Sequence, residues 1–109
     1  MPYTIPITGT GRVDVAAYGV ADAEHLVEKE LGARWPEARL LVTEVKRHPG
    51  AARIVEEFSI SYRLHAVMQT EGADEAEARR AAFRVARDRL ADSRYRHTRW
   101  DAAAEKPTG

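Results

Sequence analysis

The sequence predicts an α+β protein with a ferredoxin-like fold, in which an antiparallel βαββαβ sheet carries two helices on one face. Two segments have apolar residues at helical spacing, and they alternate with segments in which apolar and polar residues alternate. A Pro-Gly pair joins two of the alternating segments directly, which is typical of a hairpin. With 109 residues, 44% of them hydrophobic, we expect one domain over 1–101 and a disordered tail over 102–109.

The chain is expected to begin with a short strand or arm, then a turn, then a full strand. The run TIPIT at 4–8 is β-prone, but Pro6 suits only an edge strand or an arm. The run GTG at 9–11 predicts a turn, and no lysine follows it as in a phosphate-binding P-loop. Residues 12–20 alternate in polarity and predict the first strand of the βαββαβ unit.

The first helix is predicted to begin at Asp22 and to end at Trp35, before Pro36. Asp22 is a suitable N-cap, and a proline cannot continue the hydrogen-bond ladder of a helix. The apolar side chains form one narrow stripe, which we expect to be buried: Ala23, Leu26, Val27, Leu31 and Trp35.

The hairpin is predicted from two alternating segments, 38–48 and 52–70, on either side of Pro49 and Gly50. A type II turn at this pair would place Val45 opposite Ile54 and Leu41 opposite Phe58. One face of the hairpin is then mainly apolar: Leu41, Thr43, Val45, Ile54, Phe58, Ile60, Tyr62, Leu64, Ala66 and Met68. Glu56 also falls on this face, so we expect it at the rim of the sheet, where water reaches it.

The second strand of the hairpin is unusually long, and its length predicts self-association. Alternation over 54–68 corresponds to about 50 Å at ~3.3 Å per residue. Two helices of roughly 14 and 20 residues do not obviously cover that length at 1.5 Å per residue. Apolar residues are also predicted on the opposite face: Leu40, Val42, Val55 and Val67. We therefore expect the sheet to pack against a second copy, and the alternative is a β-bulge that curls the sheet.

The second helix is predicted to follow Asp74 as its N-cap, with Ala82, Phe83, Ala86 and Leu90 buried. Its acidic first turn and its arginine-rich end both favour a helix, because they oppose the helix dipole. Residues 94–100 contain Tyr, Thr and Trp and predict a closing strand, although an extension of the helix is the alternative.

A surplus of arginine near the end of the chain identifies candidate contacts to RNA or DNA. Residues 78–100 contain eight arginines and two aspartates, whereas the whole chain has a formal net charge of zero, unlike most dedicated nucleic-acid binders. Arginine forks suit phosphate oxygens, and aromatic rings on a sheet can stack on bases. The candidate nucleic-acid contacts are Arg80, Arg84, Arg87, Arg94, Arg96, Arg99, Tyr95 and Trp100.

Catalytic and cofactor motifs are not found in the sequence. The four histidines lack the spacing of metal ligands, the chain contains no cysteine, and no GxSxG nucleophile motif occurs. We therefore expect no metal or cofactor, and binding rather than catalysis. A small-molecule pocket at a dimer interface is a further hypothesis, with these candidate residues: Tyr62, Arg63, His65, Val42, Val55 and Val67.

The leading interpretation is a non-enzymatic binding or assembly protein that forms homo-oligomers through its sheet. Binding of RNA or DNA and binding of a small molecule at a dimer interface are the alternatives. No apolar run approaches the roughly 20 residues of a membrane span, so we expect no membrane partner. The first residues do not resemble a signal peptide, and with no cysteine a cytoplasmic location is expected.

Overall fold

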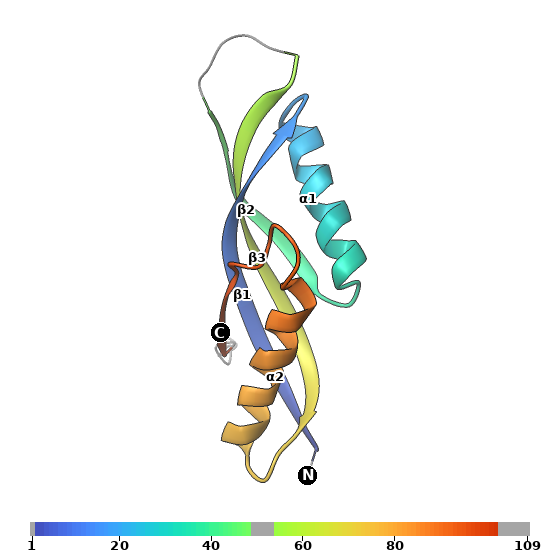
Figure 1. Cartoon of the computed structure of the whole chain (residues 1–109), viewed down its shortest axis with the longest axis vertical. Helices are drawn as coiled ribbons and strands as arrows, with labels where there is room; N and C mark the ends of the chain where they lie inside the picture. The colour runs from blue at the N-terminus through green and yellow to red at the C-terminus, as the bar shows by residue number, and fades with distance from the viewer. Residues whose placement is uncertain (1, 49–53, 103–109) are drawn as a thin grey trace, which may run out of the picture.

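Four antiparallel strands and two helices make up the structure, which is a computed structural model that describes residues 2–48 and 54–102. In chain order the elements are β1 (Pro2–Ala17), α1 (Val20–Arg34), β2 (Arg39–Arg47), β3 (Glu56–Glu71), α2 (Glu75–Leu90) and β4 (Arg99–Ala102). The strand order in the sheet is β2-β3-β1-β4, and both helices pack on the same face (Figure 1). The predicted α+β architecture, an antiparallel sheet with two helices, is confirmed.

The two longest strands, β1 and β3, pair along their whole length. The register runs from Pro2 opposite Glu71 to Ala17 opposite Glu56 without a shift. The expected N-terminal arm and the turn at 9–11 are therefore wrong, because both belong to one strand of 16 residues. Pro6 is tolerated there because β4 pairs only with residues 7–10, so β1 has a strand on one side only at Pro6.

The glycines inside β1 make room for aromatic rings. A Cβ atom on Gly9 would lie 2.6 Å from the Trp100 ring, and one on Gly11 would lie 2.5 Å from the hydroxyl of Tyr62. Both glycines have negative φ, so close approach explains them and a turn does not. The chain continues straight through both positions as a strand.

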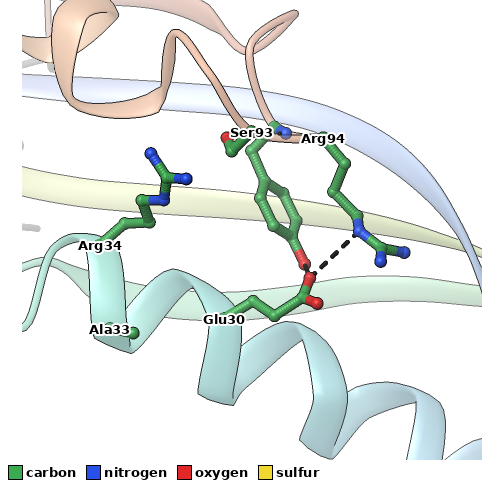
Figure 2. Close-up of a pocket in the computed structure, with 6 residues that line it drawn as sticks. Glu30, Ala33, Arg34, Ser93 and Arg94 are labelled. Atoms are coloured by element: carbon green, nitrogen blue, oxygen red, sulfur yellow. Dashed lines mark hydrogen bonds and ion pairs between the residues drawn. The ribbon is translucent and has the colours of Figure 1, made fainter.

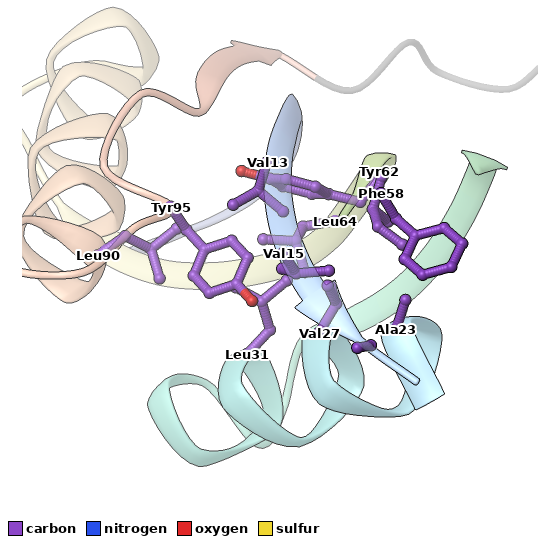
Figure 3. Packing of buried hydrophobic residues seen from close by; sticks show 12 residues of the cluster. Val13, Val15, Ala23, Val27, Leu31, Phe58, Tyr62, Leu64, Leu90 and Tyr95 are labelled. Atoms are coloured by element: carbon purple, nitrogen blue, oxygen red, sulfur yellow. The ribbon is translucent and has the colours of Figure 1, made fainter. Parts of the chain in front are cut away.

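The helices lie one after the other along the sheet, and this arrangement covers most of the long strands (Figure 1). At 1.5 Å per residue, α1 and α2 are about 22 and 24 Å long, and β3 is about 53 Å at ~3.3 Å per residue. Helix α1 packs over the half of the sheet that includes Val13 and Phe58, as Figure 3 shows, and α2 packs over the half that includes Ile7 and Met68. The hairpin end of β3 extends past α1.

Most residues of the predicted helical stripes are buried, but Leu26 and Phe83 are only half-buried, and one cap differs. Ala23, Val27 and Leu31 of α1 are buried, as is Trp35 at the C-cap of this helix. This helix begins one turn earlier than expected, with Gly19 as its N-cap and no side-chain cap, so Asp22 lies in its first turn. Helix α2 begins after Asp74 as predicted, and the Asp74 carboxylate accepts a hydrogen bond from the Glu77 amide at 2.9 Å.

The predicted hairpin register is wrong by several residues. Val45 pairs with Ile60, Leu41 pairs with Arg63, and the register shifts between Val42 and Glu44. Because of this bulge in β2, Val42 and Val45 lie on the same face, against the helices, whereas Leu41 is exposed. The predicted turn at Pro49 and Gly50 lies outside the described residues.

At the hairpin end of β3, one residue differs from its predicted position and one agrees with it. Ile54, which was expected on the buried face, is exposed. Glu56 lies at the rim as expected, and there it forms an ion pair with Arg47 at 2.9 Å.

The closing strand is shorter than predicted. Residues 91–97 form turns, and β4 begins only at Arg99. Hydroxyl groups hold these turns, because Ser93 Oγ donates to the Leu90 carbonyl at 2.8 Å and Thr98 Oγ1 donates to the Tyr95 carbonyl at 2.7 Å. The turns place Tyr95 in the core. Neither the predicted strand nor the alternative of a longer helix included this burial. Ala102, the first residue of the predicted tail, is the last residue of β4, and the rest of that tail lies outside the described residues.

Replacement of Gly9 by alanine tests the close approach of Trp100. We expect Gly9→Ala to lower the free energy of unfolding by about 1–3 kcal/mol, because the new methyl group overlaps Trp100 and Thr98. The control is Gly32→Ala in α1, where a Cβ meets nothing within 4 Å and where alanine should add about 0.5–1 kcal/mol. Urea unfolding monitored by tryptophan fluorescence measures both. Equal stability of the two variants would contradict the packing described.

Candidate functional site

The face of the sheet opposite the helices, here called the open face, has no covering element among the described residues. Alternation and register assign its side chains, since directly paired residues point to the same side. Leu41 is an exposed apolar residue on this face. Polar and charged residues dominate the central part of the face: Thr8, Thr10, Arg12, Asp14, Arg39, Glu44, Ser59, Ser61, Arg63, His65, Arg99 and Asp101.

Four arginines from four different strands meet on the open face and are here called the arginine cluster: Arg12, Arg39, Arg63 and Arg99. Thr10 of β1 pairs with Arg63 on one side and with Arg99 on the other. Arg12 is a diagonal neighbour of both, and Arg39 is a diagonal neighbour of Arg63, at about 7–8 Å between backbones. All four are exposed, and none lies within 4.0 Å of a carboxylate oxygen of residues 2–48 or 54–102.

Hydroxyl groups and one histidine lie between the arginines. Directly paired with cluster residues are Thr10, opposite Arg63 and Arg99, and Ser61, opposite Arg12. Thr8 lies two residues before Thr10 on the same face of β1. His65 sits between Arg39 and Thr8, and its Nδ1 is 3.2 Å from the Thr8 hydroxyl. Guanidinium forks together with hydroxyl donors are the groups that bind oxyanions, phosphate above all.

Three acidic side chains flank the arginine cluster. Glu44 lies across Ser61 from Arg12, Asp101 lies two residues from Arg99, and Asp14 lies two residues from Arg12. The cluster therefore carries four positive charges with three negative charges at its margins.

A serine, a histidine and an aspartate meet at the hairpin end of the open face. Ser59 Oγ donates to Asp14 Oδ1 at 2.5 Å, and His48 Nε2 lies 2.6 Å from the same Oγ. Since the serine proton is directed at Asp14, the histidine donates to Ser59 and cannot take its proton. This arrangement joins β1, β3 and the end of β2, and it lacks the order of groups that activates a serine nucleophile.

The structure also has a groove of about 330 Å³ between α1 and the turns after α2 (Figure 2). Glu30 accepts a hydrogen bond from the Tyr95 hydroxyl at 2.7 Å and forms an ion pair with Arg94 at 3.2 Å. Arg34, also in the lining, pairs with the Asp92 carboxylate and lowers its pKa. The polar groups of the groove are thus engaged with one another, and they tie α1 to the segment after α2.

The predicted nucleic-acid residues separate into three groups. Tyr95 and Trp100 pack inward, against Tyr62 and Trp35, with ring centroids 5.7 and 5.6 Å apart. Neither ring therefore lies on the open face to stack on bases. Arg80, Arg84 and Arg87 are exposed on α2, Arg94 pairs with Glu30, Arg96 donates to the Ser93 carbonyl, and Arg99 joins the arginine cluster.

The residues proposed for a small-molecule pocket do not come together. Tyr62 and Val42 face the helices, and the Tyr62 hydroxyl is 2.5 Å from Thr98 Oγ1. Arg63, His65 and Val67 lie on the open face, and Val55 is exposed at the hairpin end. Val42, together with Leu40, was expected on the open face, so much of the apolar surface predicted for sheet-to-sheet association lies against the helices instead.

Sequence reasoning missed Arg12 and Arg39 as candidate residues. The four arginines of the cluster are spread over 88 positions, from Arg12 to Arg99, so no local motif contains them. The signal that could have found them is their place on the polar side of each alternating strand, combined with the strand order.

Comparisons with protein-family models, with curated proteins and with solved structures found no significant match. No group of three or more histidine, aspartate or glutamate side chains in the described ranges is placed to hold a metal ion. In the same ranges no helix is long and apolar enough to cross a membrane.

The buried phenol of Tyr95 makes the free energy of unfolding depend on pH in the alkaline range. Burial raises the pKa of its phenol above the usual 10, and the Glu30 carboxylate raises it further. A raised folded-state pKa means that the unfolded chain releases the proton first, so stability is present below pH 10 and is lost above it. We expect a loss of about 1.4 kcal/mol from this group by pH 11, at 1.36 kcal/mol per pKa unit.

Urea unfolding at pH 8 and pH 11 measures this effect. The Tyr95→Phe variant is less stable at pH 8, because Glu30 loses a donor, but its stability should fall less between the two pH values. Burial also raises the pKa of Tyr62, so part of the alkaline loss remains in the variant. An unchanged pH dependence in Tyr95→Phe would contradict the assignment.

Proposed function

We propose that this protein is a non-enzymatic nucleic-acid-binding module that contacts the phosphates of a single-stranded chain through the arginine cluster on its open face. The observation that carries the proposal is the convergence of Arg12, Arg39, Arg63 and Arg99 from four strands without an ion-pair partner among the described residues. Two properties of the open face support this ligand: its arginine charges, and the absence of aromatic side chains from it among the described strands.

The first property is the positive charge of the arginine cluster. Like charges on neighbouring positions of a sheet repel one another and destabilise it, more so at low salt. A bound polyanion removes this repulsion and releases its own counterions, so both effects favour binding. The intervening hydroxyls of Thr8, Thr10 and Ser61 add donors for the phosphate oxygens that the guanidinium groups leave open.

The second property, the position of the aromatic side chains, indicates the kind of nucleic acid. Aromatic side chains of the four strands face the helices in the described part of the chain, so the open face offers no stacking platform for bases. Recognition then rests on the phosphate backbone and is independent of sequence. A single strand is flexible enough to follow the twisted, open face of the sheet (Figure 1). The zero net charge of the chain gives little steering, and we expect affinity in the range of non-specific binding, at a Kd of about 10⁻⁴–10⁻⁶ M.

The proposal includes a ferredoxin-like topology for the domain. Its support is the order β2-β3-β1-β4 with antiparallel neighbours, in which β1 and β2 run parallel with β3 between them, as in a split βαβ unit. In such a fold the uncovered face of the sheet is free for binding, as it is here.

Fluorescence anisotropy of a labelled single-stranded oligonucleotide tests the proposed site. Four phosphate contacts predict a slope of about −2.8 for the logarithm of the binding constant against that of the salt concentration, at about 0.7 per contact. The double variant Arg63→Gln, Arg99→Gln should reduce that slope by about 1.4 and weaken binding about tenfold or more.

The matched control removes two arginines that already have ion-pair partners. Arg47→Gln, Arg79→Gln changes the net charge equally but leaves the arginine cluster intact, so it should bind like the wild type. Equal weakening in both double variants would show that total charge, and not the cluster, governs binding. No binding by the wild type at low salt would overturn the proposal.

Self-association remains a second candidate function, and a patch of apolar side chains at the hairpin end favours it. Tyr18 and Val20 follow β1 while Ile54 and Val55 precede β3, and the last register pair, Ala17 with Glu56, brings these segments together. Tyr18 is 67% exposed and Ile54 is 81% exposed. Such a patch on an extended hairpin is typical of a contact with a second copy.

Light scattering of the purified protein at tens of micromolar checks this second candidate. We expect a dimer that Tyr18→Ser, Ile54→Ser converts to a monomer, because burial of a large apolar side chain contributes about 1.5–3 kcal/mol. The control is Val67→Ser, which removes an exposed apolar residue from the open face and should leave the dimer intact. A wild-type monomer would contradict self-association, and dissociation by Val67→Ser alone would place the contact on the open face.

A further inference from the structure

Three arginines on α2 form a second positive surface, here called the α2 row: Arg80, Arg84 and Arg87. All three are exposed. At 3.6 residues per turn, their mean direction lies about 150° around the helix from the buried stripe. Since the buried stripe faces the sheet, the α2 row points away from it. The arginine cluster is on the open face, so the two sets of arginines point to opposite sides of the sheet.

The acidic residues closest to the α2 row in sequence are Glu77, Asp88 and Asp92, and two of them make contacts with other groups. The Glu77 carboxylate accepts a hydrogen bond from the Ala73 amide at 2.7 Å, and Asp92 pairs with Arg34. Asp88, one turn from Arg84, is the acid nearest to the row in sequence, and no arginine nitrogen of the described residues lies within 4.0 Å of its carboxylate.

The other arginines of α2, in contrast, have acidic partners. Arg79 pairs with Glu75 at 2.9 Å, and Arg89 lies 3.8 Å from Glu37. The row therefore carries three positive charges, and the carboxylates beside it are those of Asp88 and Glu77.

We propose that the α2 row is a second phosphate-binding surface, so that one molecule bridges two single strands of nucleic acid. The inference rests on the proposed function of the open face and adds a second binding surface to it. The sheet and α2 lie between the two surfaces, which keeps two strands apart on opposite sides while one molecule holds them near each other. With three cations and no interleaved hydroxyls, the α2 row is the weaker of the two surfaces.

Energy transfer between two labelled strands tests bridging. Two short oligothymidylates, one with a donor dye and one with an acceptor dye, cannot pair with each other, so transfer requires a protein that holds both. We expect the wild type to produce transfer when strands are in excess and to lose it when protein is in large excess. The variant Arg80→Gln, Arg84→Gln, Arg87→Gln should lose the transfer to background and keep the binding of one strand, measured by anisotropy.

A control variant with the same change in charge is Arg34→Gln, Arg47→Gln, Arg79→Gln, whose arginines all have acidic partners. It should bridge like the wild type. Circular dichroism of each variant verifies that the fold is intact.

The outcomes separate this inference from the proposed function. Binding of one strand without transfer by the wild type would overturn bridging and leave the open face as the binding site. Transfer that persists in the α2 variant would also overturn it, since another surface or a dimer would then hold the second strand. No binding at all by the wild type would overturn both proposals.

Discussion

The pairing of β1 with β3 is the constraint on which the rest of the structure depends. Sixteen residues of each strand align without a shift, so one register decides which side chains face the helices and which face away. A slip of β3 by a single residue would expose its core residues Phe58, Ile60 and Leu64 and would bury Arg63 and His65. The burial of one face against two helices therefore also positions the polar groups of the other face.

The tandem helices explain how a chain of neutral net charge presents two positive surfaces. Each helix is about half as long as β1 and β3, so both helices fit on one side of the sheet and the other side stays open. Many acidic side chains are used in local contacts, such as Glu30 with Tyr95 and Arg94, or Glu56 with Arg47. These contacts stabilise the fold and leave the arginines of the open face without partners among the described residues.

The sequence was sufficient where a local pattern determines structure. Apolar spacing predicted the buried stripe of α1, and alternation predicted the buried residues of β3 from Phe58 to Met68. Prediction failed where a residue distant in the chain determines the local structure. The ring of Trp100, 91 residues away, leaves no room for a side chain at Gly9, and this contact cannot be read from the residues around the glycine. The register of the hairpin depends on a bulge in β2, and Tyr95 enters the core through turns held by side-chain hydroxyls.

The candidate site was predicted only in part for the same reason. Arg99 was expected to contact nucleic acid, but its neighbours in space come from three other strands, and the aromatic residues beside it in sequence pack into the core. The most direct test of the account is NMR of arginine side chains during titration with a single-stranded oligonucleotide. The account predicts that the Nε–H signals of Arg12, Arg39, Arg63 and Arg99 shift first and together. Shifts confined to the hairpin end, or none on the open face, would contradict it.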